Sequence, residues 1–400
     1  MKLKTGTPYS LLKQSAVTGF GKPLTRTSTH AQVLIVGTGI SGALIAHSLL
    51  HAGFHVCMVD KREPVRGSTP ASTGLLQYEL DGSAAELSEK FGFPQWNRIV
   101  HTMKSANAAL GKLAAPFPGC GFEVRDSLYV ASKKSDVSSL KKEFAFRTEA
   151  HLPVTWLSTD NLRNQCGVHG SAAILSRQAA KIDACALAQG LLKAGSRHGL
   201  EIYSPVNVAT YQESSSGVEV QTSSGHRLSC DHLILADGYE GYRHLTRNTF
   251  SLYSTFVTLV RPLSETPQEM PLIWETSRPY CYIRSTSSGD LLVGGEDQPL
   301  IGQKITRGVL KDVEARLLKK LHNLTSIRGR PVSTWSGAFI ASKDSLPFIG
   351  RIPGAKNVFA ALAYGANGIT FSEIGANIIL QMLNKVHHPL ESSFALDRNF

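Results

Sequence analysis

Three glycines near the N-terminus have the spacing of a phosphate-binding turn. Gly37, Gly39 and Gly42 follow the apolar run 32–36, and residues 43–52 continue with the periodicity of a helix. The first glycine allows a sharp turn, the second lets the backbone approach a pyrophosphate, and the third lets the helix pack on the sheet. The free N–H groups at the start of such a helix attract phosphates. The pattern predicts a dinucleotide site.

An acidic residue ends the second predicted strand, which covers residues 55–59. Asp60 lies there, about 20 residues beyond the glycine turn, where a carboxylate can accept hydrogen bonds from ribose hydroxyls. Its charge would repel a 2′-phosphate. Strand, turn, helix, strand and acid occur in the order that the glycine pattern requires. This order favours a dinucleotide site over an unrelated glycine-rich turn or an aspartate that only caps the strand.

Motifs at both ends of the chain point to one cofactor. A run of small and hydroxyl-bearing residues, 66–74, follows the acid and could line a long flat ligand. The segments 335–337, 344–350 and 364–370 and a closing helix follow in order near the C-terminus. With these motifs the chain resembles the D-amino-acid-oxidase-like superfamily of FAD oxidoreductases, which includes glycine oxidase, sarcosine oxidase and D-amino-acid dehydrogenase. The resemblance covers residues 31–385.

The resemblance implies how FAD would be bound. The loop after the acid would line the pyrophosphate and flavin, and the backbone of residue 206 would contact adenine. The C-terminal glycine loop would bring N–H groups to the pyrimidine end of the flavin, where donors favour charge on the reduced ring. A late cysteine holds the flavin covalently in some members, but none follows Cys281, so non-covalent FAD is expected. The predicted cofactor-binding residues are Gly37, Gly39, Ile40, Ser41, Gly42, Asp60, Lys61, Ser68, Thr69, Ser72, Thr73, Gly74, Val206, Asp237, Gly238, Gly365, Ala366, Asn367, Gly368, Ile369 and Thr370.

The substrate side has a candidate strand that resembles the family's hairpin over the flavin. Tyr280, Tyr282, Arg284 and Thr286 would share one face of it by alternation. A guanidinium can hold a carboxylate bidentately, so Arg284, Tyr282 and Tyr280 are the predicted catalytic residues. The alternatives are a surface arginine and tyrosines that only cover the sheet. Residues 77–79 could reach the active site or be purely structural.

The chain departs from its relatives at two places. In the glycine-oxidase branch an arginine follows the Trp-x-Gly motif by two residues, and Phe339 stands there here. In sarcosine-oxidase-like enzymes a lysine after the hairpin helps reduced flavin react with oxygen, and the matching residue is Leu292. The first departure weakens the prediction of a small amino-acid substrate. The second leaves open a dehydrogenase with another electron acceptor.

Composition excludes several classes of protein. Forty-two per cent hydrophobic and 18% charged residues indicate a folded globular chain rather than a disordered one. The net charge of +11 favours anionic partners without naming one, and a solvated basic surface is the simplest interpretation. The six cysteines show no C-x-x-C spacing, so no zinc site is expected. The most apolar window, residues 33–50, is too polar for a membrane span, and no signal peptide is expected.

The predicted fold is mixed α/β. It combines a Rossmann-like FAD-binding domain of the glutathione-reductase type with a second domain built on a mostly antiparallel sheet. Residues 122–131 are predicted as a strand pair, residues 133–149 as a charged helix and residues 372–383 as the closing helix. The predicted domains are an irregular N-terminal arm, 1–30; a FAD-binding domain, 31–83, 171–245 and 331–390; and a substrate domain, 84–170 and 246–330.

The resemblance implies transfer of a hydride from a C–N bond of an amine or amino acid to FAD. Such chemistry needs no protein base, because the lone pair of the amine assists. The alternatives are an FAD-dependent 2-hydroxy-acid dehydrogenase and a non-catalytic or tRNA-associated flavoprotein. The expected partners are a small-molecule substrate and oxygen or another electron acceptor. No nucleic acid is expected, and the predicted location is the cytoplasm.

Overall fold

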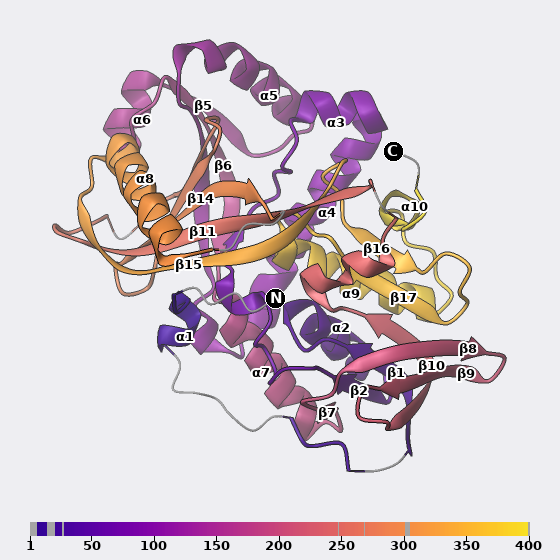
Figure 1. Ribbon diagram of the computed structural model, residues 1–400. Coiled ribbons are helices and arrows are strands. Elements are labelled where there is room, and N and C mark those ends of the chain that lie inside the picture. Colours follow the sequence, from indigo (N-terminus) through magenta and orange to yellow (C-terminus); the bar gives the residue numbers. More distant parts are fainter. Residues whose placement is uncertain are drawn as a thin grey trace. The chain divides into compact units, whose positions relative to one another are not determined.

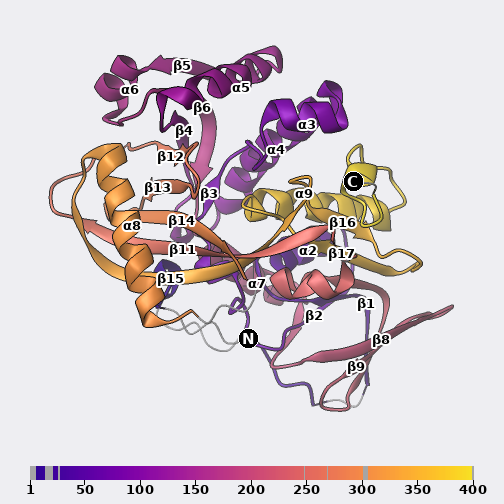
Figure 2. The same ribbon diagram turned by 45° about the horizontal axis from the view of Figure 1, so that its top comes forward.

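The protein divides into two compact units, each assembled from separate chain segments. Figures 1 and 2 show the computed structural model as ribbons. It describes residues 6–13, 21–25, 28–246, 248–267, 269–300 and 305–398. Unit 1 comprises Met1–Lys13, Ala71–Asp183 and Tyr253–Ala338, and unit 2 comprises Gln14–Pro70, Ala184–Leu252 and Phe339–Phe400. In this division residues 71–83, 171–183 and 331–338 belong to unit 1.

Unit 2 is built on an eight-stranded sheet with a parallel centre. Its strand order is β16-β17-β10-β1-β2-β7, and the β8–β9 hairpin is added beside β10. Strands β17, β10, β1, β2 and β7 pair in parallel, whereas β16 pairs antiparallel with β17. The strand bounds are β1 Ser28–Val36, β2 Val56–Val59, β7 Glu201–Tyr203, β8 Val208–Ser214, β9 Gly217–Thr222, β10 Arg227–Leu235, β16 Phe348–Arg351 and β17 Val358–Leu362.

The central strands of unit 2 follow from their composition. Strands β2 and β17 are buried at every position, as expected of a parallel sheet covered on both faces. Helix α2 packs against α7 and α9 (Figure 1). The helix bounds in unit 2 are α2 Ile40–His51, α7 Ala184–Arg197, α9 Gly368–Leu383 and α10 Glu391–Phe394, with a 3-10 helix at Gly238–His244. Strand β1 begins at Ser28, earlier than predicted, because residues 28–31 pair with residues 227–230 of β10.

Unit 1 is built on a nine-stranded, mostly antiparallel sheet, as predicted. Its order is β15-β11-β14-β13-β12-β4-β6-β3, with β5 beside β6, and only the β12–β4 pairing is parallel among the recorded registers. The strand bounds are β3 Leu75–Leu76, β4 Glu123–Ala131, β5 Val154–Ser158, β6 Ala172–Lys181, β11 Phe250–Pro262, β12 Leu272–Glu275, β13 Cys281–Ser285, β14 Leu291–Pro299 and β15 Gly329–Ser342.

Helices cover the sheet of unit 1 and its extensions. Helix α8 packs on β13 and β14, and its apolar residues join the core beneath those strands (Figure 2). The helix bounds are α1 Tyr9–Lys13, α3 Ala84–Phe91, α4 Phe93–Ala114, α5 Val137–Glu149, α6 Thr159–Cys166 and α8 Arg307–Thr325, with 3-10 helices at Thr69–Ala71, Pro118–Cys120 and Lys134–Asp136. Within the described ranges, no helix is both long and apolar enough to cross a membrane.

Three local predictions in unit 1 are wrong. The segment 122–131 contains one strand, β4, rather than a pair; its register shift between Arg125 and Ser127 is a bulge against β6, not a turn. The charged helix predicted from residue 133 begins at Val137, after a 3-10 turn. The N-terminal arm is not wholly irregular, since residues 9–13 form α1.

Candidate functional site

The glycine turn of unit 2 is closed by backbone atoms. Gly37 has φ +111°, and a Cβ atom there would lie 2.3 Å from the carbonyl oxygen of Ala236. A Cβ atom on Gly42 would lie 2.0 Å from the carbonyl oxygen of Gly37. Because backbone cannot move aside as a flexible side chain can, both positions require glycine. The turn has the steric features expected of a close approach between strand, helix and ligand.

Helix α2 presents its first turn without a side-chain cap from its N-cap residue, Gly39. The hydroxyl oxygen of Thr69 accepts one N–H group instead, at 3.0 Å from Ile40 N. Two residues predicted to bind the cofactor therefore bind each other. The remaining N–H groups of a first helical turn and the helix dipole favour an anion at this end. This end of α2 fits a pyrophosphate.

The carboxylate of Asp60 is fixed at the end of β2. Its Oδ2 accepts hydrogen bonds from the backbone N–H of Thr38 (2.9 Å) and the Thr38 hydroxyl (2.7 Å), and its Oδ1 accepts one from Arg62 N (2.9 Å). An ionised carboxylate offers about four acceptor sites, so capacity for a ribose hydroxyl remains. The N–H of Val206 donates to the carbonyl oxygen of Asp60 at 2.7 Å. A contact of Val206 with adenine would therefore need its carbonyl group.

Lys61 is held by an ion pair in unit 2. Its ammonium group contacts Glu240, whose other carboxylate oxygen accepts a hydrogen bond from Arg62 Nη2 at 2.7 Å. Burial of Glu240 alone would raise its pKa, but the hydrogen bonds and charges of the two cations outweigh burial and lower it. The three side chains form a structural ion cluster beside Asp60.

The predicted C-terminal glycine loop is partly helical. Residues 365–367 precede α9, whereas residues 368–370 form its first turn. The predicted start of this helix at Ser372 is therefore wrong, because residues 368–370, predicted to lie in the glycine loop, instead form the first helical turn. Asn367 at the N-cap provides no side-chain cap. Like α2, helix α9 begins with N–H groups that its own N-cap side chain does not satisfy.

The two glycine segments lie together in unit 2. The hydroxyl oxygens of Ser41 in α2 and Ser372 in α9 are 2.8 Å apart, and both are buried. The Tyr364 side chain lies beside them; burial raises its pKa to about 12, and the two serine hydroxyls oppose that rise. Two helix N-termini whose N-cap residues make no capping side-chain hydrogen bond therefore meet through a cluster of hydroxyls, which fits a long nucleotide cofactor bound by both segments.

The end of β10 adds an unsatisfied carboxylate to unit 2. Asp237 Oδ1 is buried and has no hydrogen-bond partner within the ranges that the structure describes. Its Oδ2 lies 3.7 Å from Nε2 of His244. The adjacent Gly238 has φ +64°, and a Cβ atom there would lie 3.6 Å from Ser68 Oγ. The structure thus brings the predicted residues Ser68, Asp237 and Gly238 to one place.

The other half of the small-residue loop belongs to unit 1. Gly74 has φ +68°, and a Cβ atom there would lie 1.8 Å from the carbonyl oxygen of Ile182. Ser72 Oγ accepts a hydrogen bond from Gly74 N at 3.2 Å. The indole N–H of Trp335 donates to the carbonyl oxygen of Ala71 at 3.1 Å. Backbone contacts therefore hold this stretch in place.

Arg284 is buried rather than exposed, with 5% of its surface accessible, so the surface-arginine alternative is wrong. Its Nε donates to the carbonyl oxygen of Thr73, and its Nη1 donates to that of Ser285 at 3.1 Å. Lys181 Nζ reaches the same Ser285 oxygen at 3.3 Å. Burial lowers the pKa of Arg284 to about 10, and nearby Tyr9 opposes that fall. The guanidinium remains charged at neutral pH.

The two predicted tyrosines occupy the face of the β13–β14 hairpin that carries Arg284. Their ring centroids are 6.0 Å apart, and Tyr282 lies over Gly294, where a Cβ atom would come within 2.2 Å of the ring. Tyr280 faces Asp297, and Tyr282 faces Thr255. Burial raises the pKa of both tyrosines well above the ordinary value. Sequence reasoning missed Thr255 and Asp297.

Residues 77–79 are held in a buried network. Gln77 Nε2 donates to Ser127 Oγ at 2.8 Å, and Tyr78 is fully buried. Glu79 forms an ion pair of 3.1 Å with Arg147. These contacts favour the structural interpretation of the segment.

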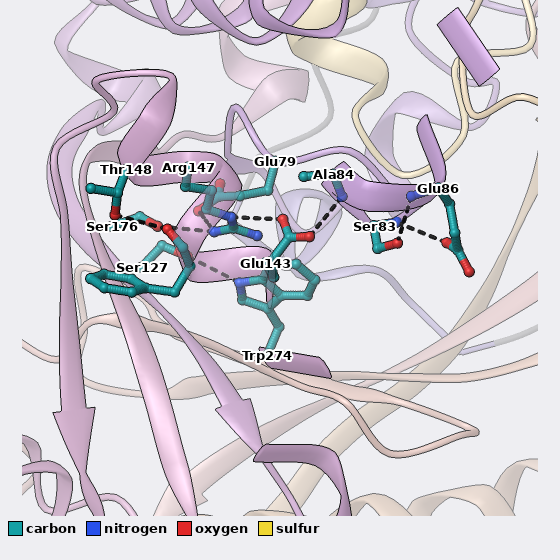
Figure 3. A network of polar contacts seen from close by, with 11 residues as sticks. Glu79, Ser83, Ala84, Glu86, Ser127, Glu143, Arg147, Thr148, Ser176 and Trp274 are labelled. Atoms are coloured by element: carbon teal, nitrogen blue, oxygen red, sulfur yellow. Dashed lines mark hydrogen bonds and ion pairs between the residues drawn. The ribbon is translucent and has the colours of Figure 1, made fainter. Parts of the chain in front are cut away.

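Figure 3 shows this network around Arg147. Its Nε lies 2.8 Å from Glu143, and its Nη1 donates to both Glu79 and Ser176. Glu143 in turn accepts the N–H of Ala84, the first residue of α3, at 2.6 Å. Burying a charge is costly unless it is paired and hydrogen-bonded, and here two carboxylates meet that need. The network connects α3, α5 and β6 within unit 1.

The N-terminal segment contributes a side chain that no local pattern indicated. Tyr9 of α1 is 6% exposed and packs in an apolar cluster with Leu259, Leu292 and Trp335. The carbonyl oxygen of Thr7 accepts a hydrogen bond of 2.8 Å from Ser333 Oγ, which fixes the segment to β15. The Leu292 departure noted in the sequence lies in this apolar cluster, and it directly opposes Arg284 across β13 and β14.

Comparison with known proteins agrees with this geometry. The family described as FAD dependent oxidoreductase (DAO) matches residues 32–382. Glycine oxidase of Geobacillus kaustophilus (strain HTA426) is 23% identical over 92% of this chain and 97% of that enzyme.

Two solved structures share the fold. The crystal structure of glycine oxidase from Geobacillus kaustophilus has a TM-score of 0.80 and 21% identity, over 93% of this chain and 100% of that one. The structure of L-proline dehydrogenase from P. horikoshii has a TM-score of 0.77 and 17% identity, over 92% of this chain and 97% of that one. The match over residues 32–382 shows that the chain belongs to the DAO family of FAD-dependent oxidoreductases and uses FAD as its cofactor.

Proposed function

We propose that the protein transfers a hydride from the carbon of a C–N bond in an amine or amino acid to non-covalently bound FAD. The relative and structures described above are named for glycine and proline oxidation, and both substrates react at a carbon next to nitrogen. Within this chain, the proposal is carried by the buried Arg284 on the tyrosine-bearing face of β13.

Unit 2 carries the residues that would hold the cofactor. When bound, FAD supplies the redox chemistry by accepting the hydride. The first turn of α2 would hold the pyrophosphate, and Asp60 would accept hydrogen bonds from the ribose. The first turn of α9 would direct N–H groups at the pyrimidine end of the flavin. Gly37 and Gly42 would keep the backbone close enough for these contacts.

Arg284 would orient a substrate carboxylate in unit 1. A guanidinium has five N–H donors. The described contacts engage Nε and Nη1, which anchors the group while other donors stay available. Lys181 donates to the same Ser285 oxygen but is already paired with Glu123 at 3.3 Å, so Arg284 is the cation assigned to the substrate. In a buried setting such charges act with little screening, so the carboxylate would be held firmly and the reacting carbon with it.

Anaerobic mixing with a panel of substrates tests the proposal. Purified protein should be yellow, and heat should release the flavin. At least one amine or amino acid should bleach the flavin under anaerobic conditions, which a stopped-flow absorbance trace at the flavin band measures. Bleaching by 2-hydroxy acids alone would replace this function with C–OH oxidation. No bleaching by any substrate, together with salt-dependent RNA binding, would favour a tRNA-associated flavoprotein.

Reoxidation of the reduced protein identifies its class of electron acceptor. Leu292 is 1% exposed and carries no charge of its own, so this position does not provide the lysine that helps reduced flavin react with oxygen in some relatives. We expect slow reoxidation by oxygen and faster reoxidation by an artificial dye. Reoxidation by air within milliseconds would instead identify an oxidase.

A further inference from the structure

Asp297 lies on the same face of the sheet as the predicted catalytic tyrosines. Its neighbour Glu296 turns to the opposite face, where it binds Arg316 (2.6 Å) and Lys320 (2.9 Å) of α8. Asp297 instead faces the hydroxyls of Tyr280 and Thr255. The carboxylate therefore belongs to the tyrosine-bearing surface.

A β-bulge produces this orientation. The β11–β14 register shifts between Ser254 and Phe256, which pair with Gln298 and Gly295, so Thr255 opposes two residues. Gly295 has φ +130° and Glu296 has φ +55°, a conformation that non-glycine residues rarely adopt. Bulges near active sites re-aim side chains. Regular alternation from Gly294, which lies under Tyr282, would have placed residue 296 on this face; the bulge places Asp297 there.

The Asp297 carboxylate is incompletely satisfied. Its Oδ1 is buried without a hydrogen-bond partner in the part of the chain that the structure describes. Burial and the charge of Asp81 raise its pKa, while the Thr255 and Tyr280 hydroxyls and the charge of Arg278 act in the opposite direction. Arg278 is exposed and lies 5.3 Å from the centroid of the Tyr280 ring. A buried carboxylate with a free oxygen is costly unless a cation pairs with it.

The surroundings of Asp297 suit an ammonium group. The rings of Tyr280 and Tyr282 stand 6.0 Å apart, and aromatic faces attract cations. Arg284 lies four residues along the chain from Tyr280, so their Cα atoms are about 13 Å apart if the strand is extended. One face therefore offers a negative end at Asp297 and a positive end at Arg284.

We propose that the substrate carries a second, non-reacting cationic group that Asp297 binds, and hence that it is a basic amino acid or a similar amino-carboxylate. This inference rests on the proposed amine oxidation. The reacting amine must be neutral, because its lone pair assists loss of the hydride. The cation at Asp297 is therefore a different nitrogen, while Arg284 holds the carboxylate.

The test compares matched substrates in anaerobic flavin reduction. Lysine, ornithine and arginine are measured against norleucine and norvaline, with both enantiomers of each. We expect the cationic substrates to be favoured at least tenfold in kcat/KM. The variant D297N should lose about tenfold for cationic substrates and change little for neutral ones. The control variant D290N, in the same hairpin and paired with the exposed Arg261, should keep the preference.

Each outcome has a distinct meaning. Neutral amino acids reacting as fast as basic ones in the unmutated protein, or D297N slowing both classes equally, would overturn the inference. Failure of every amine to bleach the flavin would overturn the proposed function instead. Binding of lysine, measured by its perturbation of the flavin spectrum before reduction, gives a second readout, and D297N should weaken it about tenfold. Should D297N fail to fold, the preference of the unmutated protein decides.

Discussion

The hydroxyl oxygen of Ser41 lies 2.8 Å from that of Ser372, although 331 positions separate the two residues. Ser41 is in the first turn of α2, and Ser372 is near the start of α9. Two helix N-termini from opposite ends of the chain thus meet in unit 2. Because each N-terminus favours negative charge, their meeting point suits a cofactor with a pyrophosphate and an electron-accepting ring.

Gly42→Ala should abolish most FAD binding. The new Cβ atom would lie 2.0 Å from the carbonyl oxygen of Gly37, and that backbone cannot yield without opening the turn. Overpacking of this kind costs about 1–3 kcal/mol, which corresponds to a fall in FAD affinity of roughly 5- to 150-fold. The ratio of flavin to protein absorbance after gel filtration measures the effect.

Gly119→Ala is the matched control for this change. A Cβ atom there would meet nothing within 4 Å, so flavin content should stay that of the unmutated protein. Full flavin content in both variants would contradict the assigned role of the glycine turn.

The central strands could be predicted because their apolar composition is typical of strands buried on both faces of a sheet. Residues 55–59 and 358–362 are short apolar runs, and β2 and β17 are buried on both faces. The start of β1 could not be predicted from composition, because residues 28–31 extend this strand by pairing with β10. The start of α9 was missed because Gly368 and Thr370 belong to a glycine motif that was interpreted as a loop, although the buried residues Ile369 and Phe371 lie in the same turn.

The candidate site could be predicted where chemistry and local spacing coincide. The glycine turn and Asp60 have such a signature, and the strand alternation around Arg284 has another. Asp297 could not be found this way, because a bulge turns it to the tyrosine face. Tyr9 has no local signal either, since its burial depends on strands more than 240 residues away along the chain.

Arg284→Ala should selectively weaken the binding of substrates that carry a carboxylate. A hydrogen bond to a charged group contributes about 1.5–3 kcal/mol, so kcat/KM should fall roughly 10- to 150-fold, mainly through KM. Arg284→Lys keeps the charge but loses the planar fork, and it should recover only part of the loss. Steady-state kinetics with an amino acid and its decarboxylated amine separate these effects.

The decarboxylated amine serves as the internal control. Its kcat/KM should change less than threefold in both variants, because it has no carboxylate for Arg284 to hold. Equal losses for the two substrates would mean that Arg284 only supports the fold of unit 1 through Thr73 and Ser285.

Tyr9→Ala should destabilise unit 1. The side chain is 6% exposed and packs on Leu259, Leu292 and Trp335, and truncating a buried aromatic residue costs about 3–5 kcal/mol. Tyr9→Phe keeps the packing and should lose at most about 1 kcal/mol. Leu12→Ala in the same helix removes a side chain that is 49% exposed, and its effect should stay within about 0.5 kcal/mol. Urea unfolding, followed by tryptophan fluorescence, measures the free energy of unfolding of the three variants. If Tyr9→Ala left this free energy unchanged, α1 would not dock on unit 1 in solution.

Glu373→Gln should stabilise the protein at neutral pH but not in acid. Burial raises the pKa of Glu373 in α9 from 4.5 to about 6. The folded state therefore binds this proton more tightly than the unfolded state does. As the pH rises from 4.5 through 6, Glu373 ionises and lowers the free energy of unfolding. The pKa shift corresponds to a destabilisation of about 2 kcal/mol above pH 6 and to no destabilisation below pH 4. Glutamine mimics the protonated form and removes this loss, so the free energy of unfolding in urea should exceed that of the unmutated protein by up to about 2 kcal/mol at pH 7 and match it at pH 4. A constant difference between the two proteins across that range would show that Glu373 titrates normally.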